Sequence, residues 1–264
     1  RRIKTHYALA RSDRMQQIVE ILVDPKFEKF ETPVKLDPKN VGIFGNYSNL
    51  AKKAYKLSEN GAEKTLGEIV ADAKLRQLRI SETEKFNHVT FYFSGGQKKE
   101  FSGEERILVP SPKCESYAEK PEMSAREQTD ALVKKLETDA EFSLIVQNFA
   151  NADLVGHSGN LEAVEKTVAV LDKCLKKELP VLFEKGFHVL ITADHGNADE
   201  MREPNGNPAA NHTKNPVPCV LFSPRGKKIP TRKNGTLADI APTAIEILGL
   251  EKPQIMTGES LQKL

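Results

Sequence analysis

The spacing of apolar residues along the first part of the chain alternates between a helical period and runs typical of strands. Helical spacing extends through residues 13–30 and again through 63–78. β-Branched and aromatic residues predict a strand at 88–96, which two glycines end, and another at 105–109. Residues 31–60 are polar and rich in turn formers, and this composition predicts a connector or hinge.

The rest of the chain shows a regular succession of helices and strands. Helical periods cover residues 124–137, 160–186 and 238–249, and apolar runs of strand type cover 142–150, 187–197 and 216–224. Helices of more than about ten residues between short buried strands favour right-handed crossovers onto a parallel sheet. We therefore expect an α/β fold with a mostly parallel sheet flanked by helices. This lobe should comprise residues 61–264 and follow a smaller segment of residues 1–60.

Composition limits the partners and the compartment. The formal net charge of the 264 residues is +2, and basic and acidic residues are interspersed, so the sequence indicates neither a nucleic-acid nor a membrane partner. A small anionic substrate remains compatible. The three cysteines are widely spaced, which favours a reducing, cytoplasmic environment over a disulfide framework. The chain begins with Arg, which is expected of a fragment or a processed chain.

Three groups of aspartate and histidine residues follow predicted strands. They are Asp153 with His157, Asp194 with His195, and His212. In a parallel sheet such loops meet at the carboxyl ends of the strands, and carboxylates and imidazoles are ligands of divalent transition metals. Each group alone is also compatible with helix capping or with surface histidines. Together they indicate a metal site.

The sequence strings around these residues resemble a known family. NFANADLVGHSGNLEA, ITADHGNADEM and NHTKNPVP resemble the metal motifs of cofactor-independent phosphoglycerate mutases, which are members of the alkaline phosphatase superfamily. SETEKFNHVTFYFSGG, GEERILVPSP and ADIAPTAIEILGL resemble the same family in the same order. The resemblance covers most of residues 61–264, and it implies an alkaline-phosphatase-like lobe.

The resemblance implies a site for two divalent cations. Asp153, His157 and His212 match the ligands of one ion, and Asp194 and His195 match part of the shell of the second. Manganese is the expected metal, with magnesium, cobalt or zinc as alternatives. The family uses no 2,3-bisphosphoglycerate as a cofactor.

Three basic residues match substrate-handling positions of the family. Lys85 matches a catalytic and substrate-binding lysine that reaches the nucleophilic serine and the transferred phosphate. Arg11 and Arg14 match an Arg-x-x-Arg pattern that grips phosphate and carboxylate in the family's transferase lobe, a task that suits the planar guanidinium. Without the resemblance, all three could be solvated side chains. Residues 1–60 would then be a remnant of the transferase lobe with the hinge.

The implied activity is the interconversion of 3-phosphoglycerate and 2-phosphoglycerate through a phosphoserine, a step of glycolysis and gluconeogenesis. The family takes its serine and one further metal-binding aspartate from an N-terminal part that these 264 residues do not match. The expected partner is therefore the missing N-terminal half of the same protein. The alternatives are another metalloenzyme of the superfamily, such as a phosphopentomutase or a phosphodiesterase, and a catalytically inactive metal-binding fragment.

Overall fold

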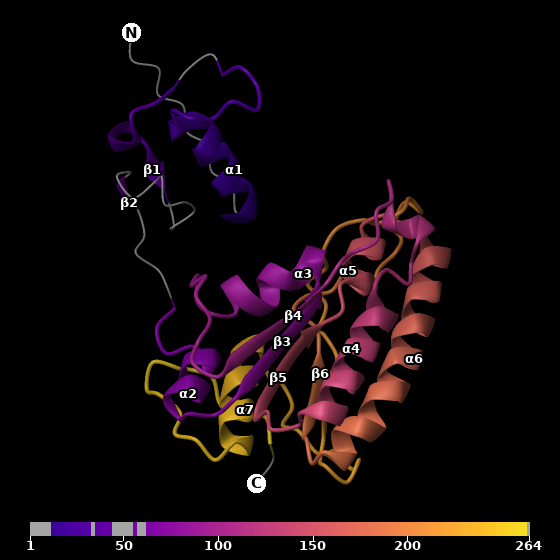
Figure 1. Cartoon of the computed structure of the whole chain (residues 1–264). Coiled ribbons are helices and arrows are strands. Elements are labelled where there is room, and N and C mark those ends of the chain that lie inside the picture. The colour runs from indigo at the N-terminus through magenta and orange to yellow at the C-terminus, as the bar shows by residue number, and fades with distance from the viewer. Residues whose placement is uncertain (1–11, 33–34, 44–54, 57–61, 263–264) are drawn as a thin grey trace. The chain divides into compact units, whose positions relative to one another are not determined.

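The computed structural model describes residues 12–32, 35–43, 55–56 and 62–262, and the chain divides into two compact units, Arg1–Ala62 and Glu63–Leu264 (Figure 1). The first unit contains helix α1 (Ser12–Val23), where a helix was predicted, and a 3₁₀ turn at Pro38–Asn40. Its two short strands, β1 (Gly42–Ile43) and β2 (Tyr55–Lys56), pair in parallel. Much of the predicted connector at 31–60 lies outside the described residues, so its role as a hinge stays a prediction.

The second unit contains the other helices and strands. In chain order these are α2 (Leu66–Asp72), β3 (Gln77–Glu82), α3 (Thr83–Asn87), a π-helical turn (His88–Tyr92), β4 (Glu104–Val109), a 3₁₀ turn (Tyr117–Glu119), α4 (Ala125–Thr138), β5 (Leu144–Asn148), α5 (Asn151–Gly156), α6 (Leu161–Glu184), β6 (Val189–Thr192), β7 (Cys219–Phe222), β8 (Lys228–Ile229), a 3₁₀ turn (Leu237–Asp239) and α7 (Ile240–Ile247). None of the helices in the described residues is long and apolar enough to cross a membrane.

The strands of the second unit form two three-stranded sheets. β4, β3 and β5 are parallel, with β3 in the centre, and this sheet confirms the predicted α/β class. β6, β7 and β8 form an antiparallel sheet. The strand predicted within 216–224 is confirmed as β7, but its antiparallel direction was not predicted. A long loop, rather than a crossover helix, connects β6 to β7, so the chain returns beside β6 in the opposite direction.

Helices cover both faces of the parallel sheet. On one face, Leu78 and Ile80 of β3 pack against Leu132 and Leu136 of α4. On the other face, α2 and α7 close a second apolar cluster around Val70. Figure 1 shows α4 and α6 along one side of the strands, with α2 and α7 on the opposite side. The three layers leave the carboxyl ends of the strands free to carry a site.

The segment around β3 differs from the sequence prediction. The helix predicted at 63–78 ends at Asp72, and the chain then enters β3, which the apolar pattern did not reveal. The strand predicted at 88–96 is wrong, because α3 continues there as a π-helical turn in which Thr90 Oγ1 donates a hydrogen bond to the carbonyl of Phe86. The two glycines end this helical segment in the left-handed region, with φ of 64° at Gly95 and 87° at Gly96.

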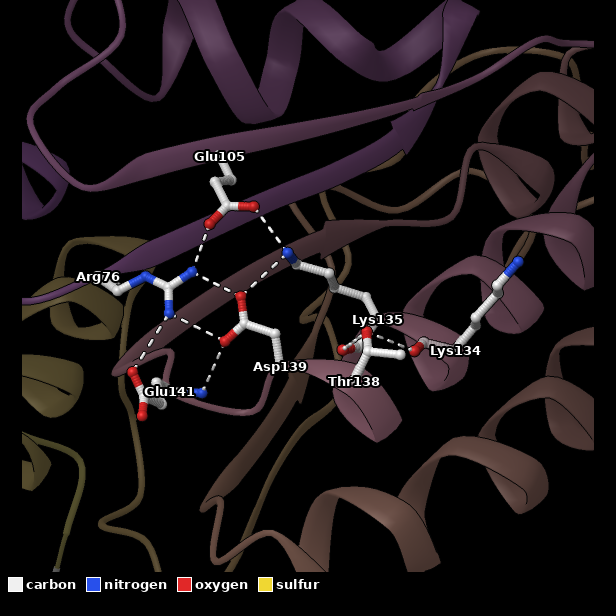
Figure 2. A network of polar contacts seen from close by, with 7 residues as sticks. All are labelled: Arg76, Glu105, Lys134, Lys135, Thr138, Asp139 and Glu141. Atoms are coloured by element: carbon white, nitrogen blue, oxygen red, sulfur yellow. Dashed lines mark hydrogen bonds and ion pairs between the residues drawn. The ribbon is translucent and has the colours of Figure 1, made fainter.

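An ion-pair network joins the amino ends of β3 and β4 to the end of α4 (Figure 2). Arg76 donates to Asp139 and Glu105, and Lys135 lies 2.8 Å from Glu105 and 3.1 Å from Asp139. The pair with Arg76 holds the pKa of Asp139 well below its usual range. This network fixes the end of the sheet opposite to the carboxyl ends of the strands.

Candidate metal centre

The topology brings four chain segments to one edge of the second unit. Lys85 lies in α3, directly after β3, and Asp153 lies in α5, directly after β5. His195 follows β6. His212 precedes β7, and since Thr192 of β6 pairs with Cys219 of the antiparallel β7, the start of β7 lies at the same edge as the end of β6.

Three side chains at this edge, those of Asp153, His157 and His212, converge on one point. Asp153 Oδ1 lies 3.1 Å from His157 Nε2 and 3.1 Å from His212 Nε2, and the two Nε2 atoms are 3.1 Å apart. The spacing of Asp153 and His157 places both on one side of a helical turn, because α5 spans Asn151–Gly156 and His157 caps it. The three atoms thus form a triangle with equal edges.

The size of this triangle fits a bound cation. An octahedral ion with bonds of about 2.1 Å holds adjacent ligand atoms about 3.0 Å apart, and a tetrahedral ion holds them about 3.4 Å apart. The observed edges fall between these values. Lone pairs of two imidazole nitrogens and a carboxylate oxygen repel one another at this distance unless a proton or a cation lies between them. The donor set suits a divalent transition metal.

The protonation of the histidines favours metal binding. His157 Nδ1 lies 2.7 Å from the carbonyl oxygen of Ala210, which can only accept, so Nδ1 carries a proton, and in the neutral ring the lone pair is on Nε2. Burial and the neighbouring rings of His195 and His157 lower the pKa of His212, against the opposing charge of Asp153. This shift favours the neutral imidazole of His212, which is the form that binds a metal.

The second carboxylate oxygen of Asp153, Oδ2, forms an ion pair with Lys85. Lys85 Nζ lies 2.5 Å from Asp153 Oδ2, and the lysine side chain is almost fully buried. Burial tends to raise the pKa of Asp153, but the ion pair with Lys85 and a hydrogen bond from Asn197 outweigh it and lower the pKa to about 2. The carboxylate is thus charged throughout the neutral range, with Oδ1 directed to the two histidines.

Asp194 and His195 lie beside this triangle. His195 stacks on His212 with ring centroids 3.7 Å apart, and ligand atoms of Asp153, His195 and His212 lie within 4.8 Å of one another. Asp194 Oδ2 is 3.6 Å from His195 Nε2, and its side chain is half exposed. The structure therefore brings all five candidate ligands to one place.

The two arginines belong to the first unit. Arg11 lies outside the described residues, and of Arg14 only the backbone, within α1, is described. Their role in binding substrate stays a prediction.

Sequence reasoning missed the side chains that brace the loops. Asn197 contacts Asp153, and Asp199 accepts hydrogen bonds from Thr213 and Asn215, which flank the His212 loop. In the sequence, only their nearness to candidate ligands indicated a role. Asn197 and Asp199 lie within the string ITADHGNADEM, and Thr213 follows His212. Gly196 leaves room for the contact between Asp199 and Thr213, since a Cβ at position 196 would lie 2.0 Å from Thr213 Oγ1.

A three-layer α/β unit with carboxylate and imidazole ligands at the carboxyl edge of its strands defines a metal-dependent class of protein. Comparison with known families makes the class specific. The description of the metalloenzyme superfamily matches residues 3–252, and the chain belongs to this family. The family and the ligand cluster together indicate the use of a divalent metal.

Curated relatives carry one name. The chain is 44% identical over 258 residues to a 2,3-bisphosphoglycerate-independent phosphoglycerate mutase of Synechococcus sp. (strain JA-2-3B'a(2-13)), covering 95% of the chain and 48% of the relative. It is 45% identical over 253 residues to the protein of the same name from Ehrlichia ruminantium (strain Gardel), covering 95% and 49%. The chain thus spans about half the length of the curated relatives it matches.

A solved structure resembles the chain over the same extent. The phosphoglycerate mutase of Leishmania mexicana, whose crystal structures were determined at low cobalt concentration, is 26% identical and superposes with a TM-score of 0.81. The similarity covers 95% of this chain and 49% of that one. The mixed α/β fold of the chain is therefore that of one half of a phosphoglycerate mutase.

Proposed function

We propose that the protein containing this chain is a cofactor-independent phosphoglycerate mutase, and that these residues form its metal-binding half. The proposal rests on the triangle of ligand atoms from Asp153, His157 and His212. The other oxygen of the aspartate, Oδ2, is paired with Lys85. The identity of 44–45% to curated relatives of that name supports the substrate, 3-phosphoglycerate or 2-phosphoglycerate. A cytoplasmic location in glycolysis and gluconeogenesis belongs to the same proposal.

The residues of the chain would divide the work between two cations. Asp153, His157 and His212 would hold one ion, and Asp194 and His195 would provide part of the shell of the other. The ions would neutralise charge on the phosphoryl group and lower the pKa of the attacking hydroxyl. Manganese fits this mixed set of carboxylates and imidazoles, and cobalt, magnesium and zinc are the alternatives. No 2,3-bisphosphoglycerate would be needed.

Lys85 would contribute a positive charge next to the reacting groups. Its ammonium is held at one edge of the site by Asp153, and it can donate to a phosphoryl oxygen or to the hydroxyl of a nucleophilic serine. Arg11 and Arg14 would bind the phosphate or carboxylate of the substrate through their planar guanidinium groups.

Two sheet edges support a contribution from a further segment of the protein. β5 and β6 each end a sheet, and neither has a second paired strand among the described residues. Both are apolar strands of the kind usually buried inside a sheet, and both lead into the loops that carry the candidate ligands. A strand from the missing half could pair there and bring the serine and the further aspartate to the site.

The test combines mass with activity. The complete gene product is stripped of metal and assayed in a coupled mutase reaction with Mn²⁺ and no 2,3-bisphosphoglycerate, and its intact mass is compared with the 29.4 kDa of this chain. We expect activity at a mass well above that value. Asp153→Asn should abolish it, whereas the control Asp130→Asn, which changes an exposed aspartate paired with Lys177, should leave it unchanged.

Other results would lead elsewhere. Hydrolysis of phosphate or sulfate esters without mutase activity would indicate another enzyme of the same superfamily. Binding of Mn²⁺ with no turnover by the complete gene product would indicate an inactive metal-binding protein. Mutase activity that survives Asp153→Asn would contradict the proposed site.

A further inference from the structure

Asn197 is a buried amide in the loop after β6, two residues beyond His195. Its exposed fraction is 4%, although this loop also contains the half-exposed Asp194. Burying an amide costs free energy unless its polar atoms are hydrogen-bonded. The partners of Asn197 therefore show what the burial achieves.

Both hydrogen bonds of the Asn197 side chain end on one residue. Nδ2 donates to Asp153 Oδ1 at 3.0 Å and to the backbone carbonyl of Asp153 at 3.1 Å. Oδ1 of Asp153 is the oxygen that faces His157 and His212, whereas Oδ2 pairs with Lys85. The carboxylate is thus held at both oxygens, by Lys85 from α3 and by Asn197 from the loop after β6, and its rotation is fixed.

This contact also ties the two halves of the metal site together. Asn197 stands in the loop that carries Asp194 and His195, and Asp153 stands in α5, which follows β5. β5 and β6 belong to different sheets, so no ladder hydrogen bonds between them set their separation. The side-chain amide of Asn197 instead links the two segments, through its hydrogen bonds to Asp153.

Gly156 leaves the space that Asn197 occupies. A Cβ at this position would lie 2.3 Å from Asn197 Oδ1 and 2.8 Å from its Cγ. The φ angle of Gly156 lies outside the left-handed region, so the backbone of α5 would accept alanine, and the three nearest atoms that a Cβ would meet all belong to Asn197. Gly156 and Asn197 therefore form a matched pair.

We propose that Asn197 is a positioning residue that orients the Asp153 carboxylate for metal binding and couples the loop after β6 to α5. The inference rests on the proposed metal site at Asp153. The Nδ2 group of Asn197 directs Oδ1 of Asp153 toward the histidines without occupying all of that oxygen's lone pairs. Residues that orient a ligand in this way typically contribute a factor of about 10 to 100 to metal affinity.

The first experiment measures Mn²⁺ affinity by calorimetric titration of the complete, metal-stripped gene product. Asn197→Ala should bind about 10 to 100 times more weakly. Asn197→Leu keeps most of the volume but cannot donate, and it should be as weak as the alanine variant. Gln128→Ala is the control, because Gln128 is also buried but donates to the backbone carbonyl of Asn148 instead of to a candidate ligand. Its affinity should stay within about twofold of wild type.

The second experiment uses the matched pair. Gly156→Ala should weaken Mn²⁺ binding when Asn197 is present, because the new methyl group displaces the amide. In the Asn197→Ala background the same substitution should have little further effect, since the space is then free. Thermal melts of each variant without metal separate loss of affinity from loss of folding.

Several outcomes would overturn the proposal. Wild-type affinity in Asn197→Leu would mean that the side chain only fills space. Equal losses in Gln128→Ala would mean that any buried amide matters, and additive effects of Gly156→Ala and Asn197→Ala would mean that the two residues act separately. Failure of the underlying metal site is distinguishable, because Asp153→Asn would then bind Mn²⁺ as well as wild type does.

Discussion

Replacing Lys85 by Met should change metal binding and catalysis in opposite directions. Lys85 holds Asp153 Oδ2 at 2.5 Å, while Oδ1 of the same carboxylate faces the two histidines. A metal ion and the ammonium group would therefore share one carboxylate. Two cations so close repel each other, and the protein would retain Lys85 at the expense of metal affinity.

The distances set the magnitude of this repulsion. A cation bound to Oδ1 with a bond of about 2.1 Å would lie roughly 6 Å from Lys85 Nζ. For charges of +2 and +1 at that separation, the repulsion is about 1.4 kcal/mol with the dielectric constant of water and about 5.5 kcal/mol with an effective value of 20. Lys85 is only 6% exposed, so we expect at least the smaller value, and Lys85→Met should bind Mn²⁺ at least about 10-fold more tightly.

The same variant should lose activity. A missing charge next to the transferred phosphoryl group typically costs a factor of about 10² to 10³ in turnover. In the metal-free protein, Lys85→Met also removes the partner of a buried carboxylate, and breaking such a pair costs about 3 to 5 kcal/mol. Added Mn²⁺ should restore most of that stability, because the ion neutralises Asp153 in place of the lysine.

The assay is a Mn²⁺ titration of metal-stripped protein, with melting temperatures measured with and without the ion. Lys177→Met is the control, because Lys177 forms an ion pair of 2.6 Å with Asp130, and both side chains are exposed. Its metal affinity and activity should match wild type. Weaker Mn²⁺ binding by Lys85→Met would refute the argument, since it would show that the lysine supports the metal instead of competing with it.

Three further predictions concern stability. Leu78→Ala removes a fully buried side chain from the centre of β3 and should lower the free energy of unfolding by about 2 to 5 kcal/mol in urea titrations, whereas Leu108→Ala, at a position 51% exposed on β4, should cost less than about 1 kcal/mol. Burial raises the pKa of Glu178. The stability that Glu178 contributes is therefore present below its unfolded pKa and is lost as the pH rises through its folded pKa. Glu178→Gln should raise the melting temperature at pH 7 to 8 but not near pH 4. The pKa of Asp139 is lowered by Arg76, so its contribution is present above the unfolded pKa and is lost as the pH falls through the folded pKa; Arg76→Met should lower the melting temperature at neutral pH, and the loss should shrink in acid and in about 1 M salt.

The positions of the candidate ligands could be predicted from sequence because topology concentrates them. Asp153 and His195 each follow an apolar run that forms a strand, and strand ends of an α/β sheet are where such side chains meet. The four-residue spacing of Asp153 and His157 needed only one helical turn, which α5 supplies. His212 was less constrained, since the antiparallel return of β7 that places it was not predicted.

The central strand β3 escaped prediction because its polar residues look like surface residues. Only Leu78 and Ile80 are apolar, and they alternate with Gln77, Arg79 and Ser81, all of which are fully buried. The burial of Arg79 depends on tertiary contacts that a sequence does not show. Its guanidinium lies 4.1 Å from the centre of the Phe93 ring and donates to Gln77, and burial lowers its pKa to about 10.

The segment that follows β3 shows a similar limit. The composition of residues 88–96 fits a strand, because β-branched and aromatic side chains are common there. The structure instead continues α3 as a π-helical turn, and Val89 and Thr90 are buried in that conformation. The side-chain composition of a segment indicates which residues it can bury. The neighbouring helices and strands determine whether the segment buries them as a helix or as a strand.

The glycines beside the ligands extend this reasoning to the site. Gly156 precedes His157, and Gly196 follows His195, and in both places a Cβ would lie within 2.3 Å of a side-chain oxygen from another segment. Those oxygens belong to Asn197 and Thr213, the residues that brace α5 and the His212 loop. A site assembled from loops of two separate sheets has no ladder to set its dimensions. The small residues let the loops approach, and the polar side chains fix the distance. The result is the 3.1 Å spacing of His212 from the ligand atoms of Asp153 and His157.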